Sequence, residues 1–183
     1  MKFRNNISIL DQYTSGAITK IVFYLLGIIL LSISSKISIP FFPVPMTLQT
    51  FVVYFIAASM GMVGFYSTIS YVALGLMGLP IFAAGGGIAY IMSPTFGFLY
   101  GMILASFFIA YLSKNLFNKK IIRLFLAISL GAVIIFACGI IHLAGYIGLQ
   151  KALTVGLYPF VYSEFLKIAL AILVAYLFIK KIN

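Results

Sequence analysis

Long apolar segments constrain this chain more than any other feature. Breaks at glycines, prolines and Lys/Arg clusters divide its 183 residues into six mainly apolar segments, each close to the roughly 20 residues that a helix needs to cross a bilayer core. The segments cover residues 18–36, 46–61, 62–79, 94–113, 123–146 and 158–179. At 64% hydrophobic and 8% charged residues, the chain exceeds the apolar share of soluble globular proteins, which is roughly 45–50%. The sequence therefore predicts an all-α integral membrane protein: one domain over residues 1–183, with six transmembrane helices in a single bundle.

The basic residues predict the orientation, because cytoplasmic loops carry the excess of Lys and Arg. With both termini cytoplasmic, only Lys36 and Lys151 fall on the outer side, and Lys167 lies within the last segment. The remaining basic residues fall on the cytoplasmic side: Lys2, Arg4, Lys20, Lys114, Lys119, Lys120, Arg123, Lys180 and Lys181. Five or seven helices would place the C-terminal lysines on the opposite side of the membrane from the N-terminal basic residues. We therefore expect a multi-pass protein of the cytoplasmic (inner) membrane, with segment 1–16 as a polar cytoplasmic tail.

The net charge of +10 also raises the question of nucleic acid as a partner. A nucleic-acid-binding surface gathers its basic residues into a patch or stripe. Here they lie at the edges of apolar segments. The expected surroundings are therefore the lipid bilayer, and no nucleic-acid partner is expected.

One pair of opposite charges stands inside an apolar segment. The chain has two acidic residues, and the first, Asp11, belongs to the polar tail, whereas Glu164 lies three residues before Lys167 in the last segment. An ionisable group at membrane depth costs about 2.5–3.5 kcal/mol on insertion scales and is read by default as functional. The spacing places both side chains on one helix face, so a self-neutralising structural pair is the alternative interpretation.

Further polar side chains are predicted in the outer half of the bundle. Thr47, Gln49 and Thr50 begin the second segment, and His142 lies near the outer end of the fifth. Interhelical hydrogen bonding is the alternative role for the threonines and the glutamine. Cys138 shares a helix face with His142, but the chain has one Cys and one His, so packing is favoured over a metal site or a nucleophile. No metal ion and no cofactor are expected.

Two connections expected on the outer side are apolar, unlike ordinary water-exposed loops. The first, residues 37–45, contains three prolines, and the second, residues 78–87, ends in three glycines and is followed by Ser-Pro-Thr at 93–95. Irregular backbone is tolerated at membrane depth where it is buried in protein or lines a cavity. We interpret both connections as a lid over an outward-facing pocket. No Gly-Lys-Ser/Thr follows the glycines, so a phosphate-binding loop is disfavoured.

Three stretches resemble motifs of a known family. Residues 39–50, IPFFPVPMTLQT, resemble the first-loop signature of BioY, the biotin-specific S component of energy-coupling factor (ECF) transporters. Residues 75–83, GLMGLPIFA, followed by SPTFG at 93–97, resemble its second motif. Residues 163–167, SEFLK, resemble its Gly-Asp-x-x-Lys pattern, with Glu164 one methylene longer than the usual Asp.

The resemblance implies a six-helix bundle that captures biotin from outside, in a pocket closed by the first and third loops. It also implies a partner, the ECF module, which consists of a transmembrane T protein and two ABC ATPases. The chain has no Walker A sequence, so an ATP-driven step has to be supplied by such a partner. Two alternatives stay open: an S component for a different vitamin, and a solitary biotin transporter that acts without the module.

For the site, we expect Glu164 to accept from a urea N–H of biotin and Lys167 to donate to a ligand oxygen. Gln49 and Thr47 would add neutral hydrogen bonds, and His142 is a further candidate. The aromatic residues expected to wall the apolar parts of the ligand are Phe41, Phe42, Phe82 and Tyr90. An intramembrane enzyme is disfavoured, because these residues supply no paired catalytic carboxylates and no well-placed serine dyad.

Overall fold

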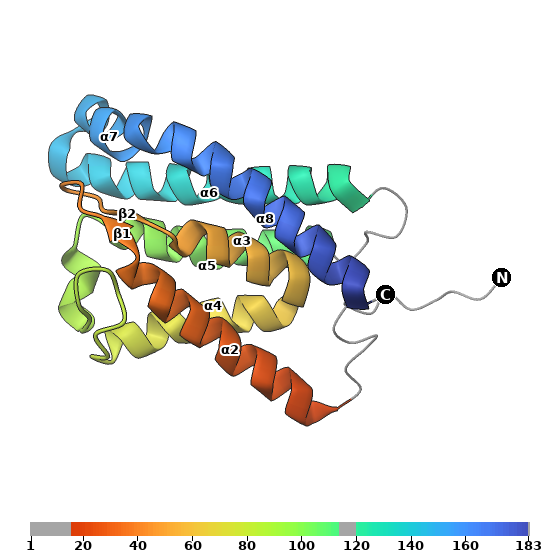
Figure 1. Ribbon diagram of the computed structural model, residues 1–183. Coiled ribbons are helices and arrows are strands. Elements are labelled where there is room, and N and C mark those ends of the chain that lie inside the picture. The colour runs from red at the N-terminus through yellow and green to blue at the C-terminus, as the bar shows by residue number, and fades with distance from the viewer. Residues whose placement is uncertain (1–15, 114–119, 183) are drawn as a thin grey trace.

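Antiparallel helices follow one another along the chain in the computed structural model, which describes residues 16–113 and 120–182 (Figure 1). The main helices are α2 (Ala17–Lys36), α3 (Gln49–Met60), α4 (Met62–Leu76), α5 (Phe96–Ser113), α6 (Lys120–Ile147) and α8 (Val161–Ile182). Each of the six predicted segments overlaps one of these helices, and α2, α6 and α8 extend beyond the predicted bounds. The predicted polar tail, apart from Gly16, and the loop lysines Lys114 and Lys119 lie outside the described residues.

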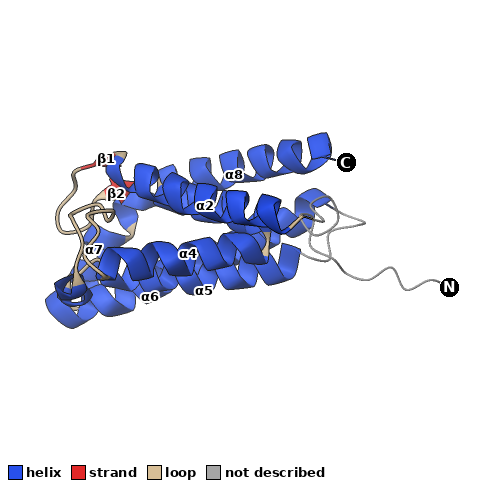
Figure 2. Cartoon of the chain, turned by 90° about the horizontal axis from the view of Figure 1, so that it is seen from below, coloured by secondary structure: helices blue, strands red, loops and turns tan. Residues whose placement is uncertain are grey.

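The shorter elements gather at one end of the bundle, which we call the loop end (Figures 1 and 2). They are the strands β1 (Ser38–Ile39) and β2 (Met46–Thr47), the 3₁₀ helices η1 (Ile88–Met92) and η2 (Tyr158–Phe160), and helix α7 (Leu149–Gly156). Helix α2 begins and helix α8 ends at the opposite end (Figure 1). The α2–α3 connection (residues 37–48) and the α4–α5 connection (residues 77–95) therefore meet at the loop end.

Four stretches are long and apolar enough to cross a membrane: Ala17–Lys36, Phe96–Ser113, Ile121–Ile147 and Leu149–Ile179. The last combines α7, η2 and most of α8. Helices α3 and α4 are apolar but have only 12 and 15 residues, so α3 is about 18 Å long at 1.5 Å per residue. These stretches make the chain a multi-pass membrane protein, whereas the six-crossing count stays a prediction.

Helix α3 lies in the middle of the bundle. Ten of its twelve residues are buried, although it is shorter than the helices around it. It joins α4 at Gly61, whose φ of 59° is a conformation that favours glycine. Three residues later, a Cβ at Gly64 would lie 2.3 Å from the carbonyl oxygen of Ile56. Glycine at these two positions therefore lets α3 and α4 turn sharply and pack closely.

The start of the second predicted segment is wrong by three residues. Helix α3 begins at Gln49, and Thr47 lies in β2, where it pairs with Ser38 of β1 in an antiparallel register. The Leu48 amide donates to the Ile37 carbonyl at 3.0 Å, and the Gln49 amide donates to Thr47 Oγ1 at 3.3 Å. In a helix starting at residue 46 these two amides would lack intrahelical partners, whereas the hairpin satisfies both, so it replaces the first helical turn.

Helix α7 was not predicted. Its eight residues lie between the fifth and sixth predicted segments, in a stretch expected to form an external loop. It buries Ala152 and Gly156 and leaves Leu149 exposed. A segment this short carries too few apolar repeats to separate a helix from a loop by periodicity.

Candidate functional site

Glu164 and Lys167 form a buried ion pair on α8, as their spacing predicts. Lys167 Nζ lies 3.2 Å from Glu164 Oε2, with 12% of the lysine side chain and 7% of the glutamate side chain exposed. Helix α3 supplies two further partners. Tyr54 donates to Glu164 Oε1 at 2.6 Å, and Thr50 donates to Oε2 at 3.2 Å while accepting from Lys167 at 3.1 Å. The four side chains join the two helices in one polar network.

The network leaves binding capacity at both charged groups. A carboxylate has about four acceptor positions and an ammonium has three donors. Glu164 accepts three hydrogen bonds and Lys167 donates two. One acceptor position and one donor are therefore left for a ligand. A structural role for the pair and a binding role are compatible in this geometry.

A cavity of about 50 Å³ opens beside this network. This volume is below the roughly 300–1,000 Å³ of small-molecule pockets, whereas the mostly apolar walls with a few polar groups match them. The lining residues come from both connections and from several helices: Val44, Pro45, Thr47, Gln49, Thr50, Ala83, Tyr90, Thr95, Phe98, Leu99, Met102, Phe136, Phe160, Glu164 and Lys167.

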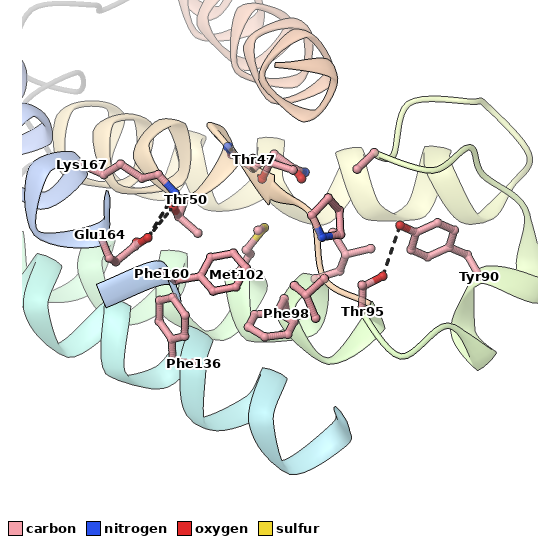
Figure 3. Close-up of a pocket in the computed structure, with 15 residues that line it drawn as sticks. Thr47, Thr50, Tyr90, Thr95, Phe98, Met102, Phe136, Phe160, Glu164 and Lys167 are labelled. Carbon is pink, nitrogen blue, oxygen red and sulfur yellow. Dashed lines mark hydrogen bonds and ion pairs between the residues drawn. The ribbon is translucent and has the colours of Figure 1, made fainter. Parts of the chain in front are cut away.

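The cavity has two polar ends (Figure 3). At one end lie Glu164 and Lys167, and at the other lie Thr95 and Tyr90, whose hydroxyl oxygens are 3.3 Å apart. Four apolar side chains, Phe98, Met102, Phe136 and Phe160, lie between the two ends, together with Thr47. The arrangement fits an elongated ligand with an apolar middle and polar groups at both ends.

Five of the predicted site residues line this cavity: Thr47, Gln49, Tyr90, Glu164 and Lys167. Gln49 is 3% exposed, and its Nε2 donates to the Tyr71 hydroxyl at 2.8 Å. The two charged residues, the amide and the two hydroxyl groups come from α8, α3, β2 and η1. The fold therefore brings together groups that are up to 120 positions apart in the sequence.

The other four predicted residues are not in the lining. Phe42 is 94% exposed, and Phe41 is 45% exposed with its ring 6.4 Å from that of Phe160. Phe82 is fully buried behind the cavity, with its ring 4.7 Å from that of Tyr90. His142 lies among aromatic rings of α5 and α6, and its Nε2 is 3.1 Å from the Ser93 carbonyl oxygen.

Tyr54 is the main site residue absent from the sequence prediction. It lies one helical turn after Thr50, so both face α8, and this spacing is a signal that could have found it. Phe98, Phe136 and Phe160 carry no such signal, because the chain has 18 phenylalanines in apolar surroundings. Within residues 16–113 and 120–182, no three His, Cys, Asp or Glu side chains gather as a metal-binding group.

A bundle of apolar helices around a two-ended cavity defines a membrane protein that binds a small molecule. The chain belongs to the BioY family, whose model matches residues 5–183, so the predicted resemblance is confirmed.

Two relatives cover most of the chain. It is 40% identical to the "Biotin transporter BioY" of Thermotoga maritima, over 80% of this chain and 87% of the relative. It is 35% identical to the "Probable biotin transporter BioY" of Pyrococcus horikoshii, over 82% and 90%. A crystal structure of the S-component for biotin from an ECF-type ABC transporter superimposes with a TM-score of 0.79, covering 88% of this chain and 91% of that one, at 22% identity. At that identity the superposition demonstrates a shared fold.

Proposed function

We propose that this protein captures biotin for uptake across the cytoplasmic membrane. The observation that carries the proposal is the cavity with a buried ion pair at one end, hydroxyl groups at the other and aromatic walls between them. Biotin has matching parts: a cyclic urea, an apolar ring and tail, and a terminal carboxylate. Relatives named as biotin transporters support this choice of ligand over other vitamins.

In this proposal the urea lies at the charged end. Glu164 has one free acceptor position for an N–H group, and Lys167 has one free donor for a ligand oxygen. The carboxylate of biotin then extends away from Glu164, because two like charges at short distance in a low dielectric repel strongly. Thr95 donates to the Tyr90 hydroxyl oxygen, which leaves the proton of Tyr90 as a donor for the ligand at the far end. Phe160 and Phe136 contact the apolar middle.

The proposal includes an arrangement in the membrane. Helices α2, α3, α4, α5, α6 and α8 each cross it, with both termini cytoplasmic and the loop end outside. The start of α2 and the end of α8 lie together at the opposite end, which supports an even number of crossings (Figure 1). As an S component, and not an enzyme, the protein would depend on an ECF module, a T protein with two ABC ATPases, for transport.

Titration calorimetry of the purified protein in detergent with biotin tests this function. Saturable binding by the wild type is expected, with no binding of thiamine or riboflavin. Lys167→Met and Glu164→Gln are each expected to weaken biotin binding strongly, because each removes a charged group that contacts the urea, and hydrogen bonds to charged groups are worth about 1.5–3 kcal/mol. Lys151→Met, at an exposed position of α7, is the matched control and is expected to bind normally.

Two results would count against the proposal. Folded wild-type protein that does not bind biotin would reject biotin as the ligand. Normal biotin binding by folded Lys167→Met and Glu164→Gln would keep the ligand and reject the site, leaving the ion pair with a structural role alone.

A further inference from the structure

A second polar chain runs from the cavity to the α4–α5 connection. Gln49 Nε2 donates to the Tyr71 hydroxyl at 2.8 Å, and Tyr71 donates to the carbonyl oxygen of Ile81 at 3.0 Å. We call these three groups the Gln49–Tyr71 relay. Tyr71 is fully buried, and among the described residues that line the cavity Gln49 is present whereas Tyr71 is not. Through hydrogen bonds between described residues, Tyr71 is therefore joined to the cavity by Gln49.

The relay has a fixed direction. A carbonyl oxygen only accepts, so the single hydroxyl proton of Tyr71 is committed to Ile81 and its oxygen is left as an acceptor. An acceptor at this place requires a donor, so the Gln49 amide has to turn its NH₂ group towards Tyr71. The orientation of this amide follows from its neighbours and not from its own preference.

The other side of the amide is unpaired. Gln49 Oε1 accepts no hydrogen bond from the described part of the chain, although Gln49 is 3% exposed and lines the cavity. Among the described residues, Ser113 Oγ is the one buried side-chain oxygen or nitrogen without a partner. Gln49 Oε1 is therefore accessible from the cavity, where a ligand N–H can donate to it. The cavity therefore presents an acceptor at Gln49.

We propose that Tyr71 is a positioning residue that fixes the Gln49 carbonyl as an acceptor for a ligand N–H group. The inference rests on the proposed function, in which the N–H groups are those of the biotin urea. An amide free to rotate would offer NH₂ or oxygen equally well. The relay fixes the amide with its oxygen towards the cavity. A site of this kind favours ligands that donate to the Gln49 carbonyl over ligands that leave it unpaired.

The relay also links recognition to the α4–α5 connection. The Ile81 carbonyl accepts a second hydrogen bond from Ser35 of α2, at 2.6 Å. The next residue, Phe82, is fully buried, with its ring 5.5 Å from that of Tyr71. The Ile81 carbonyl, which accepts from Tyr71, is therefore held by Ser35 of α2 and by the buried ring of Phe82. The orientation of the Gln49 amide depends on the position of the α4–α5 connection.

A double-mutant cycle measured by biotin calorimetry in detergent tests the inference. Tyr71→Phe is expected to weaken biotin binding about tenfold, the size of one well-placed hydrogen bond, and Gln49→Ala by at least as much. The double variant is expected to bind no more weakly than Gln49→Ala, within about twofold, because Tyr71 acts through Gln49. Tyr66→Phe makes the same change at an exposed position of α4 and is expected to match the wild type.

Gln49→Glu provides a variant that keeps Tyr71. Its carboxylate presents an acceptor to the cavity in either orientation, so Tyr71 is no longer needed to select one. Adding Tyr71→Phe to Gln49→Glu is therefore expected to change biotin binding by less than about twofold. Desthiobiotin, which keeps the cyclic urea and lacks the sulfur, is expected to give the same coupling between Tyr71 and Gln49 as biotin does.

Each contrary result has a distinct meaning. An equal loss of affinity from Tyr71→Phe in the wild type, in Gln49→Ala and in Gln49→Glu would overturn the positioning role while leaving biotin capture intact. Coupling with biotin but not with desthiobiotin would overturn the assignment to the urea. A folded wild type that binds neither ligand would overturn the proposed function, and this inference with it.

Discussion

The α4–α5 connection is anchored by side chains from helices, whereas the α2–α3 connection is held mainly by its own backbone pairing. In the first, Phe82 is fully buried between Tyr71 and Tyr90, and Lys36 donates to its carbonyl at 2.6 Å. In the second, the two-residue strands β1 and β2 pair with each other, and Phe42 at the turn between them is 94% exposed.

Both connections look alike in sequence, since each is apolar, aromatic and rich in proline or glycine. Irregular backbone leaves carbonyl groups without helical partners. In the α4–α5 connection, side chains of α2 and α4 donate to the carbonyls of Ile81 and Phe82. We infer that the α4–α5 connection is a fixed wall of the cavity. The α2–α3 connection contributes Val44, Pro45 and Thr47 to the lining and is the more easily displaced cover. The following predictions test this contrast.

The largest expected difference lies between two phenylalanines. Phe82→Ala removes a fully buried ring and is expected to destabilise the protein by about 3–5 kcal/mol, as large-to-small core changes do. Phe42→Ala, at the exposed turn, is expected to leave stability unchanged. Thermal unfolding in detergent, followed by circular dichroism, measures both. Similar losses in the two variants would break the comparison.

The packing of the Phe82 ring can also be tested at Gly75 of α4, which the ring contacts. A Cβ at Gly75 of α4 would lie 2.2 Å from the tip of the Phe82 ring, so Gly75→Ala is expected to cost about 1–3 kcal/mol through overpacking. Gly145→Ala is the matched control, because a Cβ there meets nothing within 4 Å. Gly145 lies in the last turn of α6, where the change is expected to alter stability by less than about 1 kcal/mol. Equal unfolding temperatures in the two variants would contradict the close packing of Phe82 against Gly75.

A smaller effect is expected from the lysine at the end of α2. Lys36→Met removes the donor to the Phe82 carbonyl and is expected to cost about 1 kcal/mol. Hydrogen exchange measured by mass spectrometry should become faster in peptides that cover residues 79–87, and not in those that cover 37–48. Lys151→Met serves as the control, and unchanged exchange at 79–87 would remove this anchor from the comparison.

The smallest effect is expected at the cover itself. The Phe41 ring contacts the Phe160 ring of the cavity wall, with centroids 6.4 Å apart, and such contacts are worth about 0.5–1.5 kcal/mol. Phe41→Leu is therefore expected to speed biotin release a few-fold in a radioligand dissociation experiment while the unfolding temperature stays unchanged. A lowered unfolding temperature would mean that the α2–α3 connection is also part of the fixed structure.

Much of the fold could be predicted because it depends on local properties. Each apolar segment overlaps a helix, since segment length and helix periodicity are read directly from the chain. Glu164 and Lys167 meet because their spacing alone places them on one face of α8. The hairpin that moves Thr47 out of α3 could not be predicted, because the pairing of β1 with β2 competes with the first helical turn through long-range backbone bonds.

The candidate site was predicted less completely, because its remaining contacts join separate helices. The sequence does not distinguish the exposed Phe42 from the buried Phe82, since both lie in apolar loop stretches. It does not pair Tyr54 with Glu164 or Gln49 with Tyr71. His142 was placed near the site by its depth, but its ring nitrogen is directed to a carbonyl of the α4–α5 connection.

The shortness of α3 has a consequence for how this protein is made. In the folded bundle α3 has little contact with lipid, because ten of its twelve residues are buried. Before the other helices have packed around it, a short segment that carries Gln49, Thr50 and Tyr54 partitions weakly into a bilayer by itself. We expect α3 to leave the insertion machinery together with α4, as one hairpin closed at Gly61. Its polar side chains Thr50 and Tyr54 would then bond to Glu164 only after α8, which follows in the chain, has been synthesised.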